Sequence, residues 1–365
     1  MDSVNHGGDL KRFAKTFGVR EEDLLDFSCN INPLGIPDSV ARVYRESERE
    51  LSLYPDPRAE DLCKEVSGHY GLLPENVIAG NGSMGLLALT LRTLNPKKAL
   101  LVEPCFTEYR RLLALQGVEI SSVLLKASQE FQFPLAEILD AMKSVECLIL
   151  GHPNNPTGTV LKRAELLALL EEAGRRGVFV VLDEAFADWM PEISASDQVR
   201  RMNHLIVIRS LTKFFALPGI RAGFALGPAS WIEKMQHHQE TWSCNRLAQK
   251  LSVAALRDAF FQERSRAWFR GESEWFRKAL SSLEGFRVFP SAANFFLAKA
   301  PLPPKSVSLF EFLGSRGICP RSVADFKGLD ESYFRTAVLL REDNRVLLES
   351  LKLWIQESVK PVAAS

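Results

Sequence analysis

One lysine lies in a setting that suits covalent chemistry. Lys213 ends a Ser-Leu-Thr-Lys run that begins at Ser210, directly after an apolar segment, and Arg221 follows in a Gly-Ile-Arg-Ala-Gly run. A neighbouring cation lowers the pKa of a lysine and makes its amine available to attack a carbonyl group. The alternative is a solvated surface lysine, since most lysines are exposed. The run therefore indicates a nucleophile only if other motifs support it.

A carboxylate pair follows another apolar run. Asp183 and Glu184 come directly after the segment Val-Phe-Val-Val-Leu. A carboxylate at the end of a buried strand costs free energy unless it meets a partner, so the pair is a candidate for binding a positively charged group. The alternative is a helix N-cap, a role that aspartate also fills.

Two turn-forming motifs also follow apolar runs. The first contains Gly82, Ser83 and Met84 and precedes a helical pattern, where backbone N–H groups and a positive helix end suit a phosphate. The second is Pro-Asn-Asn-Pro-Thr-Gly, which contains Asn155. Each motif alone is also typical of an ordinary tight turn.

The elements that position these motifs alternate between strands and helices from about residue 75. The pattern predicts strands at 77–81, 99–104, 119–125, 147–152, 179–183, 205–210 and 221–226, and helices at 84–94, 108–115, 135–143 and 163–176. Such alternation predicts βαβ units and a mostly parallel sheet covered on both faces. Ligands bind such sheets at the carboxyl ends of the strands, which is where all four motifs lie.

The remaining chain predicts a smaller α+β domain. Strands are expected at 287–289 and 293–298, and helices at 308–315 and 344–357. We divide the chain into an arm (1–45) that packs with the small domain, a large domain (46–260) and a small C-terminal domain (261–365).

Composition excludes several classes of protein. The 365 residues carry 45 basic and 45 acidic side chains, which argues against nucleic acid or an anionic membrane as partner. The six cysteines form no Cys-x-x-Cys pair, so no metal site is expected, and they suit a reducing compartment. No run of about 18 apolar residues exists. These features predict a cytoplasmic protein without a membrane span.

Together the four motifs resemble the pyridoxal-phosphate enzymes of fold type I over nearly the whole chain. The resemblance implies an aspartate-aminotransferase-like α/β fold, with a large domain built on a mostly parallel mixed sheet and a smaller α+β domain. It implies pyridoxal 5'-phosphate as cofactor, with Lys213 holding it as a Schiff base. Asp183 would pair with the pyridine nitrogen and keep the ring able to accept electrons.

The resemblance also assigns the other cofactor contacts. Asn155 would hydrogen-bond the phenolic oxygen of the ring, and Phe106 would stack on its face. The phosphate side would be formed by Gly82, Ser83, Met84, Ser210, Thr212 and Arg221. Tyr54, in a Tyr-Pro-Asp-Pro run, resembles the tyrosine that reaches the phosphate from a partner subunit, which implies a homodimer.

Two branches of the fold type are similar to this chain: L-threonine-O-3-phosphate decarboxylase of cobalamin biosynthesis and histidinol-phosphate aminotransferase. The His-Gly-Gly run at His6, the Asp-Phe-Ser-Cys-Asn-Ile-Asn-Pro-Leu-Gly run and Phe186 favour the decarboxylase, since the aminotransferases usually carry a tyrosine in place of Phe186. Against this, Leu339 stands where the decarboxylases carry an arginine, and the run from Arg341 resembles the aminotransferase C-terminus.

We therefore predict decarboxylation of L-threonine O-3-phosphate to (R)-1-aminopropan-2-yl phosphate. The substrate phosphate would dock on His6, Asn32 and Arg321, while Arg335 would meet the carboxylate and Asn155 would also contact the substrate. The alternatives are a histidinol-phosphate or related aminotransferase and a non-enzymatic sensor of the cofactor. The sensor is disfavoured because such proteins usually carry a DNA-binding domain, and the sequence contains none.

Overall fold

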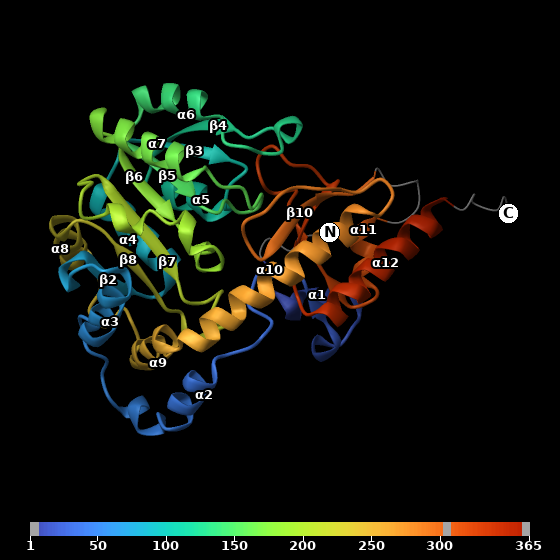
Figure 1. Cartoon of the computed structure of the whole chain (residues 1–365), viewed down its shortest axis with the longest axis horizontal. Coiled ribbons are helices and arrows are strands. Elements are labelled where there is room, and N and C mark those ends of the chain that lie inside the picture. Colours follow the sequence, from blue (N-terminus) through green and yellow to red (C-terminus); the bar gives the residue numbers. More distant parts are fainter. Residues whose placement is uncertain (1–6, 302–307, 360–365) are drawn as a thin grey trace.

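A seven-stranded sheet organises the larger part of the protein in the computed structural model, which describes residues 7–301 and 308–359 (Figure 1). The strand order is β2-β8-β7-β6-β5-β3-β4. The strands are β2 (Val77–Gly80), β3 (Lys98–Glu103), β4 (Glu119–Leu124), β5 (Cys147–Gly151), β6 (Phe179–Asp183), β7 (Leu205–Ser210) and β8 (Gly223–Leu226). The predicted alternation of strands and helices is confirmed, with strand ends shifted by a residue or two.

Strands such as β5 and β2 are apolar and fully buried because both faces of the sheet are covered, whereas β4 at the sheet edge contains Glu119, Ser121 and Ser122. Alternate residues join different cores: Leu148 and Leu150 pack in one, whereas Cys147 and Ile149 pack in the other. Helices α3 (Glu60–Tyr70), α6 (Leu135–Ala141), α7 (Arg163–Arg175) and α9 (Arg246–Arg257) cover the first face, and α4 (Gly82–Leu94), α5 (Thr107–Leu115) and α8 (Ala229–His238) cover the second.

One strand of the large sheet runs against the others. β8 pairs antiparallel with both β7 and β2, and Ser210 at the end of β7 lies opposite Gly223 at the start of β8. The remaining neighbours are parallel, so β3, β5, β6 and β7 all end at one edge. β2 also ends at this edge, since Gly80 pairs with Gly223.

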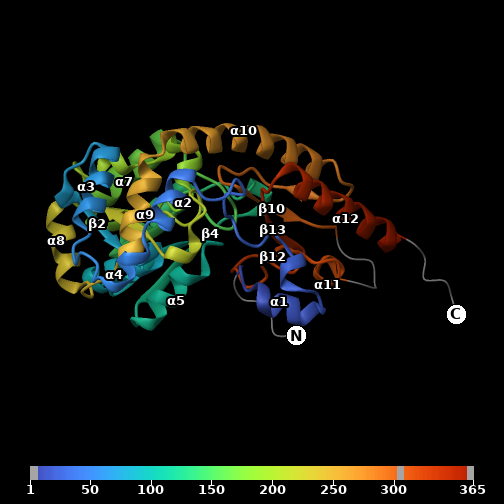
Figure 2. The ribbon, with the colours of Figure 1, turned by 90° about the horizontal axis from the view of Figure 1, so that it is seen from below.

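The smaller part contains an antiparallel sheet in the order β12-β13-β10-β9. Its strands are β9 (Arg287–Val288), β10 (Phe295–Lys299), β12 (Arg321–Ser322) and β13 (Tyr333–Ala337), and its helices are α11 (Leu309–Gly314) and α12 (Arg341–Val359). The long helix α10 (Ala259–Ser281) runs between the two parts (Figures 1 and 2). The expected boundary at 260 falls in the first turn of α10.

The N-terminal segment contacts both parts. It contains α1 (Leu10–Phe17), β1 (Leu25–Asp26) and α2 (Asp38–Arg45). β1 pairs with β11 (Ile318–Cys319), and Phe27 joins the apolar core of the smaller part. Helix α2 instead packs on α9 of the larger part. The chain between them therefore passes the carboxyl edge of the large sheet.

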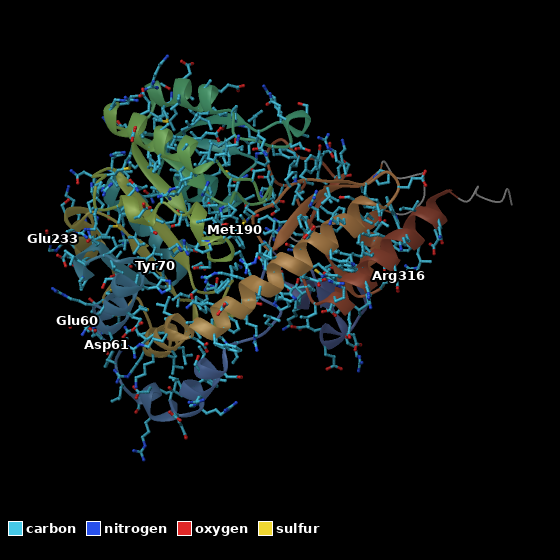
Figure 3. All side chains as sticks on the ribbon, in the orientation of Figure 1. Glu60, Asp61, Tyr70, Met190, Glu233 and Arg316 are labelled. Carbon is cyan, nitrogen blue, oxygen red and sulfur yellow. The ribbon has the colours of Figure 1, made fainter. Side chains whose placement is uncertain are left out.

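Charged side chains lie on the outer faces of the helices. Figure 3 shows Glu60 and Asp61 on α3 and Glu233 on α8 at the surface, with Arg316 at the far end of the smaller part. None of the helices in the described ranges is long and apolar enough to span a membrane.

Candidate active site

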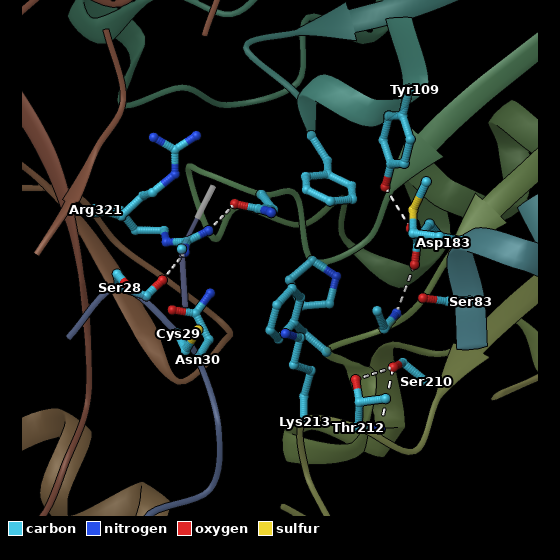
Figure 4. Close-up of a pocket in the computed structure, with 18 of the residues that line it drawn as sticks. Ser28, Cys29, Asn30, Ser83, Tyr109, Asp183, Ser210, Thr212, Lys213 and Arg321 are labelled. Carbon is cyan, nitrogen blue, oxygen red and sulfur yellow. Dashed lines mark hydrogen bonds between the residues drawn. The ribbon is translucent and has the colours of Figure 1, made fainter. Parts of the chain in front are cut away.

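A cavity of about 210 Å³ lies at the carboxyl edge of the large sheet, where the smaller part and the N-terminal segment meet it (Figure 4). The predicted site residues that line it are Ser83, Met84, Phe106, Asn155, Asp183, Ser210, Thr212, Lys213, Arg221, Arg321 and Arg335. Residues distant in the sequence are thus brought together as expected from their positions after strands.

Lys213 projects its amine into this cavity (Figure 4). Burial lowers the pKa of the Lys213 amine, and the positive charges of Arg335 and Arg221 lower it further. The shift favours the neutral amine, which is the form that attacks a carbonyl group. The surface-lysine alternative is therefore wrong for Lys213.

One end of the cavity suits a phosphate. Gly82 begins α4 with φ of 73°, and a Cβ there would lie 2.8 Å from a terminal nitrogen of Arg221. A Cβ on Gly223 would lie 2.9 Å from the backbone nitrogen of Ser83. The glycines thus allow a helix N-terminus and a guanidinium to converge on one place, and both favour an anion.

Two hydroxyl groups adjoin this cradle. The Ser210 and Thr212 side-chain oxygens lie 2.7 Å apart, on the turn between β7 and Lys213. Hydroxyls accompany backbone N–H groups in many phosphate sites because they can donate to its oxygens. Since both residues also line the cavity, the donor set on this side fits the phosphate of the implied cofactor.

A buried carboxylate lies deeper in the cavity. Asp183 accepts hydrogen bonds from the Tyr109 hydroxyl at 2.8 Å and from the Ala185 N–H at 3.0 Å (Figure 4). Burial raises the pKa of Asp183, and these two hydrogen bonds oppose that rise. A carboxylate so desolvated is suited to bind a protonated ring nitrogen. Tyr109 was not predicted; its only sequence signal is that it lies one helical turn after Phe106.

An ion network supports this carboxylate from behind. Arg209 donates to Glu184 at 2.7 Å and to Asp188 at 2.5 Å, and Glu184 also accepts from the Ala195 N–H at 2.7 Å. Glu184 and Arg209 are both buried, and they adjoin Asp183 and Ser210 in the sequence. Of the two carboxylates predicted as a pair, Asp183 therefore lines the cavity and Glu184 binds Arg209 in the structure. Neither acts as a simple helix N-cap.

Two arginines line the side of the cavity formed by the smaller part. Arg335 donates to Asn155 Oδ1 at 2.5 Å and to the Ser28 carbonyl at 2.6 Å. Its Nε is buried and has no hydrogen-bond partner among the described residues. Arg321 donates to Asp325 at 2.8 Å. Burial and the nearby Arg321 charge lower the pKa of Arg335, so this side of the cavity favours an anionic ligand.

The predicted site residues Asn32 and Tyr54 do not line the cavity. The Asn32 amide donates to the Phe214 carbonyl and to Ser265 Oγ, both at 2.8 Å, so it ties the N-terminal segment to the fold, and the cavity lining does not include it. His6 lies outside the described residues. Tyr54 is 75% exposed.

The C-terminal pattern that resembled an aminotransferase also lies away from the cavity. Arg341 is bound to the buried Glu272 at 2.8 Å, and its guanidinium stacks 3.8 Å from the Trp275 ring centre. Leu339 packs against the apolar core of the smaller part. Arg321 and Arg335, the two arginines predicted to meet the substrate anions, both line the cavity, whereas Arg341 does not. The sequence reasoning missed Ser28, Cys29, Asn30 and Phe326, which also line it.

Comparison with known proteins identifies the family. Residues 22–351 match the family model for class I and II aminotransferases. Threonine-phosphate decarboxylase of Salmonella typhimurium is 35% identical over 350 residues, covering 95% of each chain. The crystal structure of histidinol-phosphate aminotransferase from Clostridium acetobutylicum is 29% identical, with a TM-score of 0.86 over 92% of this chain and 100% of the other.

A third relative shares only the fold. Histidinol-phosphate aminotransferase from Sinorhizobium meliloti, solved with pyridoxal-5'-phosphate, is 18% identical and has a TM-score of 0.83, covering 98% of this chain and 99% of that one. The predicted aspartate-aminotransferase-like fold is thereby confirmed. The chain belongs to the class I and II aminotransferase family.

Proposed function

We propose that this chain is a pyridoxal-phosphate-dependent decarboxylase that converts L-threonine O-3-phosphate to (R)-1-aminopropan-2-yl phosphate. The observation that carries the proposal is the 35% identity to threonine-phosphate decarboxylase over 95% of both chains. The site agrees with it, since a lysine and a buried carboxylate face two arginines that favour an anionic substrate.

The residues present fit the cofactor. The Gly82 and Ser83 backbone, Ser210, Thr212 and Arg221 would hold its phosphate, Phe106 would cover one ring face, and Met84 would line the phosphate side. Asp183 would bind the ring nitrogen, and the Asn155 amide NH₂ would donate to the ring oxygen, because Asn155 Oδ1 already accepts from Arg335. When bound, the cofactor supplies an electron sink for the bond broken at the substrate Cα.

The protein residues orient the substrate and handle the proton. Arg335 is held by Asn155 and Ser28, and it would bind the substrate carboxylate so that the bond to Cα stands perpendicular to the cofactor ring. Arg321 would meet the substrate phosphate at the outer end. Lys213, whose pKa is lowered by burial, would return a proton to Cα after CO₂ leaves.

Phe186 favours decarboxylation over amino transfer. Its ring lines the cavity and packs edge-on against Phe295, with ring centres 5.0 Å apart. Phenylalanine supplies no hydroxyl to the ring oxygen, which leaves Asn155 as the side-chain donor there. A decarboxylase tolerates this because it does not need the second half of a transamination cycle.

The test pairs two reactions of the purified enzyme. CO₂ release from L-threonine O-3-phosphate without any keto acid is expected, and amino transfer from histidinol phosphate to 2-oxoglutarate is not. Brisk amino transfer without CO₂ release would instead establish the aminotransferase alternative, which the 29% identity to the Clostridium acetobutylicum enzyme keeps as the second candidate. Cofactor binding without turnover of either substrate would favour the sensor.

The active form is a homodimer in this proposal. Tyr54 and Leu51 are 75% and 73% exposed, and the Tyr54 ring packs on the half-exposed Trp242 with ring centres 4.6 Å apart. Exposed aromatic and aliphatic side chains of this kind are typical of a subunit interface. Tyr54 would reach the cofactor phosphate of the partner subunit.

A further inference from the structure

The loop between β12 and β13 (residues 323–332) forms one wall of the cavity. Phe326 is 3% exposed and lines the cavity, and the Arg321 guanidinium carbon lies 5.3 Å from its ring centre. Asp325 accepts from Arg321 at 2.8 Å. The position of this loop therefore sets where Phe326 and Arg321 face the substrate.

Lys327 links this loop to the large sheet through polar contacts, beside Val323, Phe326 and Leu329, which pack in the apolar core of the first face of that sheet. Lys327 Nζ lies 3.0 Å from Glu103 Oε2 and 3.1 Å from Ser122 Oγ. Glu103 is the last residue of β3, and Ser122 lies in β4. The contact thus links the smaller part to the edge strand β4 and its neighbour β3, beside the connection that carries Phe106.

The surroundings of Glu103 favour its ionised carboxylate. Its side chain is 4% exposed, and Arg110 donates to its other oxygen at 2.8 and 3.0 Å. Burial by itself would raise the pKa of Glu103, but its interactions with Ser122, Arg110 and the ammonium of Lys327 outweigh burial and hold the pKa below its usual value. The anionic partner of Lys327 is therefore present at neutral pH.

We propose that Lys327 is a positioning residue that holds the 323–332 loop closed over the substrate end of the cavity. The proposal rests on the proposed function, because that function places the substrate beside Arg321. Lys327 is 51% exposed, so the ion pair is screened by salt and weak enough to open. Opening would move Phe326 and Asp325 together, because both belong to the loop, and would loosen the contact of Asp325 with Arg321 on β12.

The same two strands provide a matched control. Lys98 lies 2.7 Å from Glu119 and joins β3 to β4 at the opposite end, away from the cavity. Lys98→Met removes an ion pair between the same two strands without touching the loop, although this pair is more exposed on its acidic side, since Glu119 is 70% exposed and Glu103 is 4% exposed. Lys327→Arg keeps the charge and tests whether the pairing, rather than the lysine side chain, is needed.

The experiment compares Lys327→Met, Lys327→Arg and Lys98→Met as holoenzymes. We expect Lys327→Met to raise the KM for L-threonine O-3-phosphate by roughly 3- to 10-fold with kcat little changed, which is the scale for losing one partly buried ion pair. Hydrogen exchange of the 323–332 backbone should be faster in Lys327→Met. Lys327→Arg should restore both properties, and Lys98→Met should match the wild type.

Two results would overturn the proposal. One is wild-type exchange of the 323–332 loop in Lys327→Met, and the other is an equal change of KM in Lys98→Met. Hydrogen exchange does not depend on turnover, so it separates this proposal from the proposed function. If the wild-type enzyme releases no CO₂ but the loop exchanges faster in Lys327→Met, the proposed reaction fails while the role of Lys327 stands.

Discussion

Removing the Tyr109 hydroxyl tests how the buried carboxylate is kept ionised. Tyr109→Phe deletes the donor that lies 2.8 Å from Asp183 Oδ2 but keeps the ring, which packs at 89° to Phe106 with centres 5.7 Å apart. Asp183 would retain only the Ala185 N–H at 3.0 Å. Because burial already raises the pKa of Asp183, the protonated form gains population in the variant.

The expected size follows from the kind of hydrogen bond. A hydrogen bond to a charged group contributes about 1.5–3 kcal/mol. If the variant loses this free energy only in the transition state, where the ring nitrogen must carry positive charge, kcat falls by roughly 10- to 100-fold. The KM should change less, because Tyr109 lies on the cofactor side of the site.

The assay measures kcat for CO₂ release between pH 6 and 9, together with cofactor affinity by equilibrium dialysis. Tyr333→Phe is the control, since Tyr333 is a buried tyrosine that packs on Phe289 at a distance from Asp183. The reasoning is refuted if Tyr109→Phe keeps kcat within about twofold of the wild type across this range, or if Tyr333→Phe loses as much.

Three further predictions concern the predicted site residues. Lys213→Ala should still bind the cofactor weakly but release no measurable CO₂, and borohydride reduction of the wild type should label Lys213; a label on another lysine would contradict the assignment. Asp183→Asn should lose several powers of ten in rate, yet without cofactor it should be more stable than the wild type at pH 7. Because the pKa of Asp183 is raised in the folded state, its contribution to stability is fully present below the unfolded pKa of 3.8 and is lost as the pH rises through the folded pKa. The free energies of unfolding of wild type and Asp183→Asn should therefore converge in acid. Equal melting temperatures at pH 7 would count against the burial argument. Mixing Lys213→Ala with Tyr54→Phe should give more activity than the mean of the separate preparations, because hybrid dimers contain one intact composite site; a fully active monomer on size exclusion would exclude this.

The large sheet could be predicted because its signals are local. Most of its strands are apolar runs, and each site motif follows one, so the topology of a parallel sheet places Phe106, Asn155, Asp183 and Lys213 at one edge. The fold and the cofactor followed from a resemblance that these motifs carry together. The comparisons confirm that fold.

The residues that escaped prediction act through tertiary contacts. Tyr109 has the sequence signature of a core position on α5, and only the structure shows its hydroxyl at Asp183. Asn32 was assigned to the substrate from its motif, but its amide closes a contact with the Phe214 carbonyl, far along the chain. Helix α10 was not predicted, although its buried side chains Phe261, Phe269, Phe276 and Leu280 recur at helical spacing. Hydrogen bonds such as those of Tyr109 and Asn32 join residues far apart in the sequence, so no local sequence pattern reveals them.

The reversal of β8 has a mechanical consequence. Because β7 ends and β8 begins as hydrogen-bonded neighbours, the connection between them leaves and returns at the same edge of the sheet. Lys213 and Arg221 both lie on that connection, so their spacing belongs to one rigid unit of the larger part. Arg321 and Arg335 belong to the other sheet. A shift of the smaller sheet would therefore leave the spacing of Lys213 and Arg221 unchanged, so that product would leave without loosening the residues that hold the cofactor.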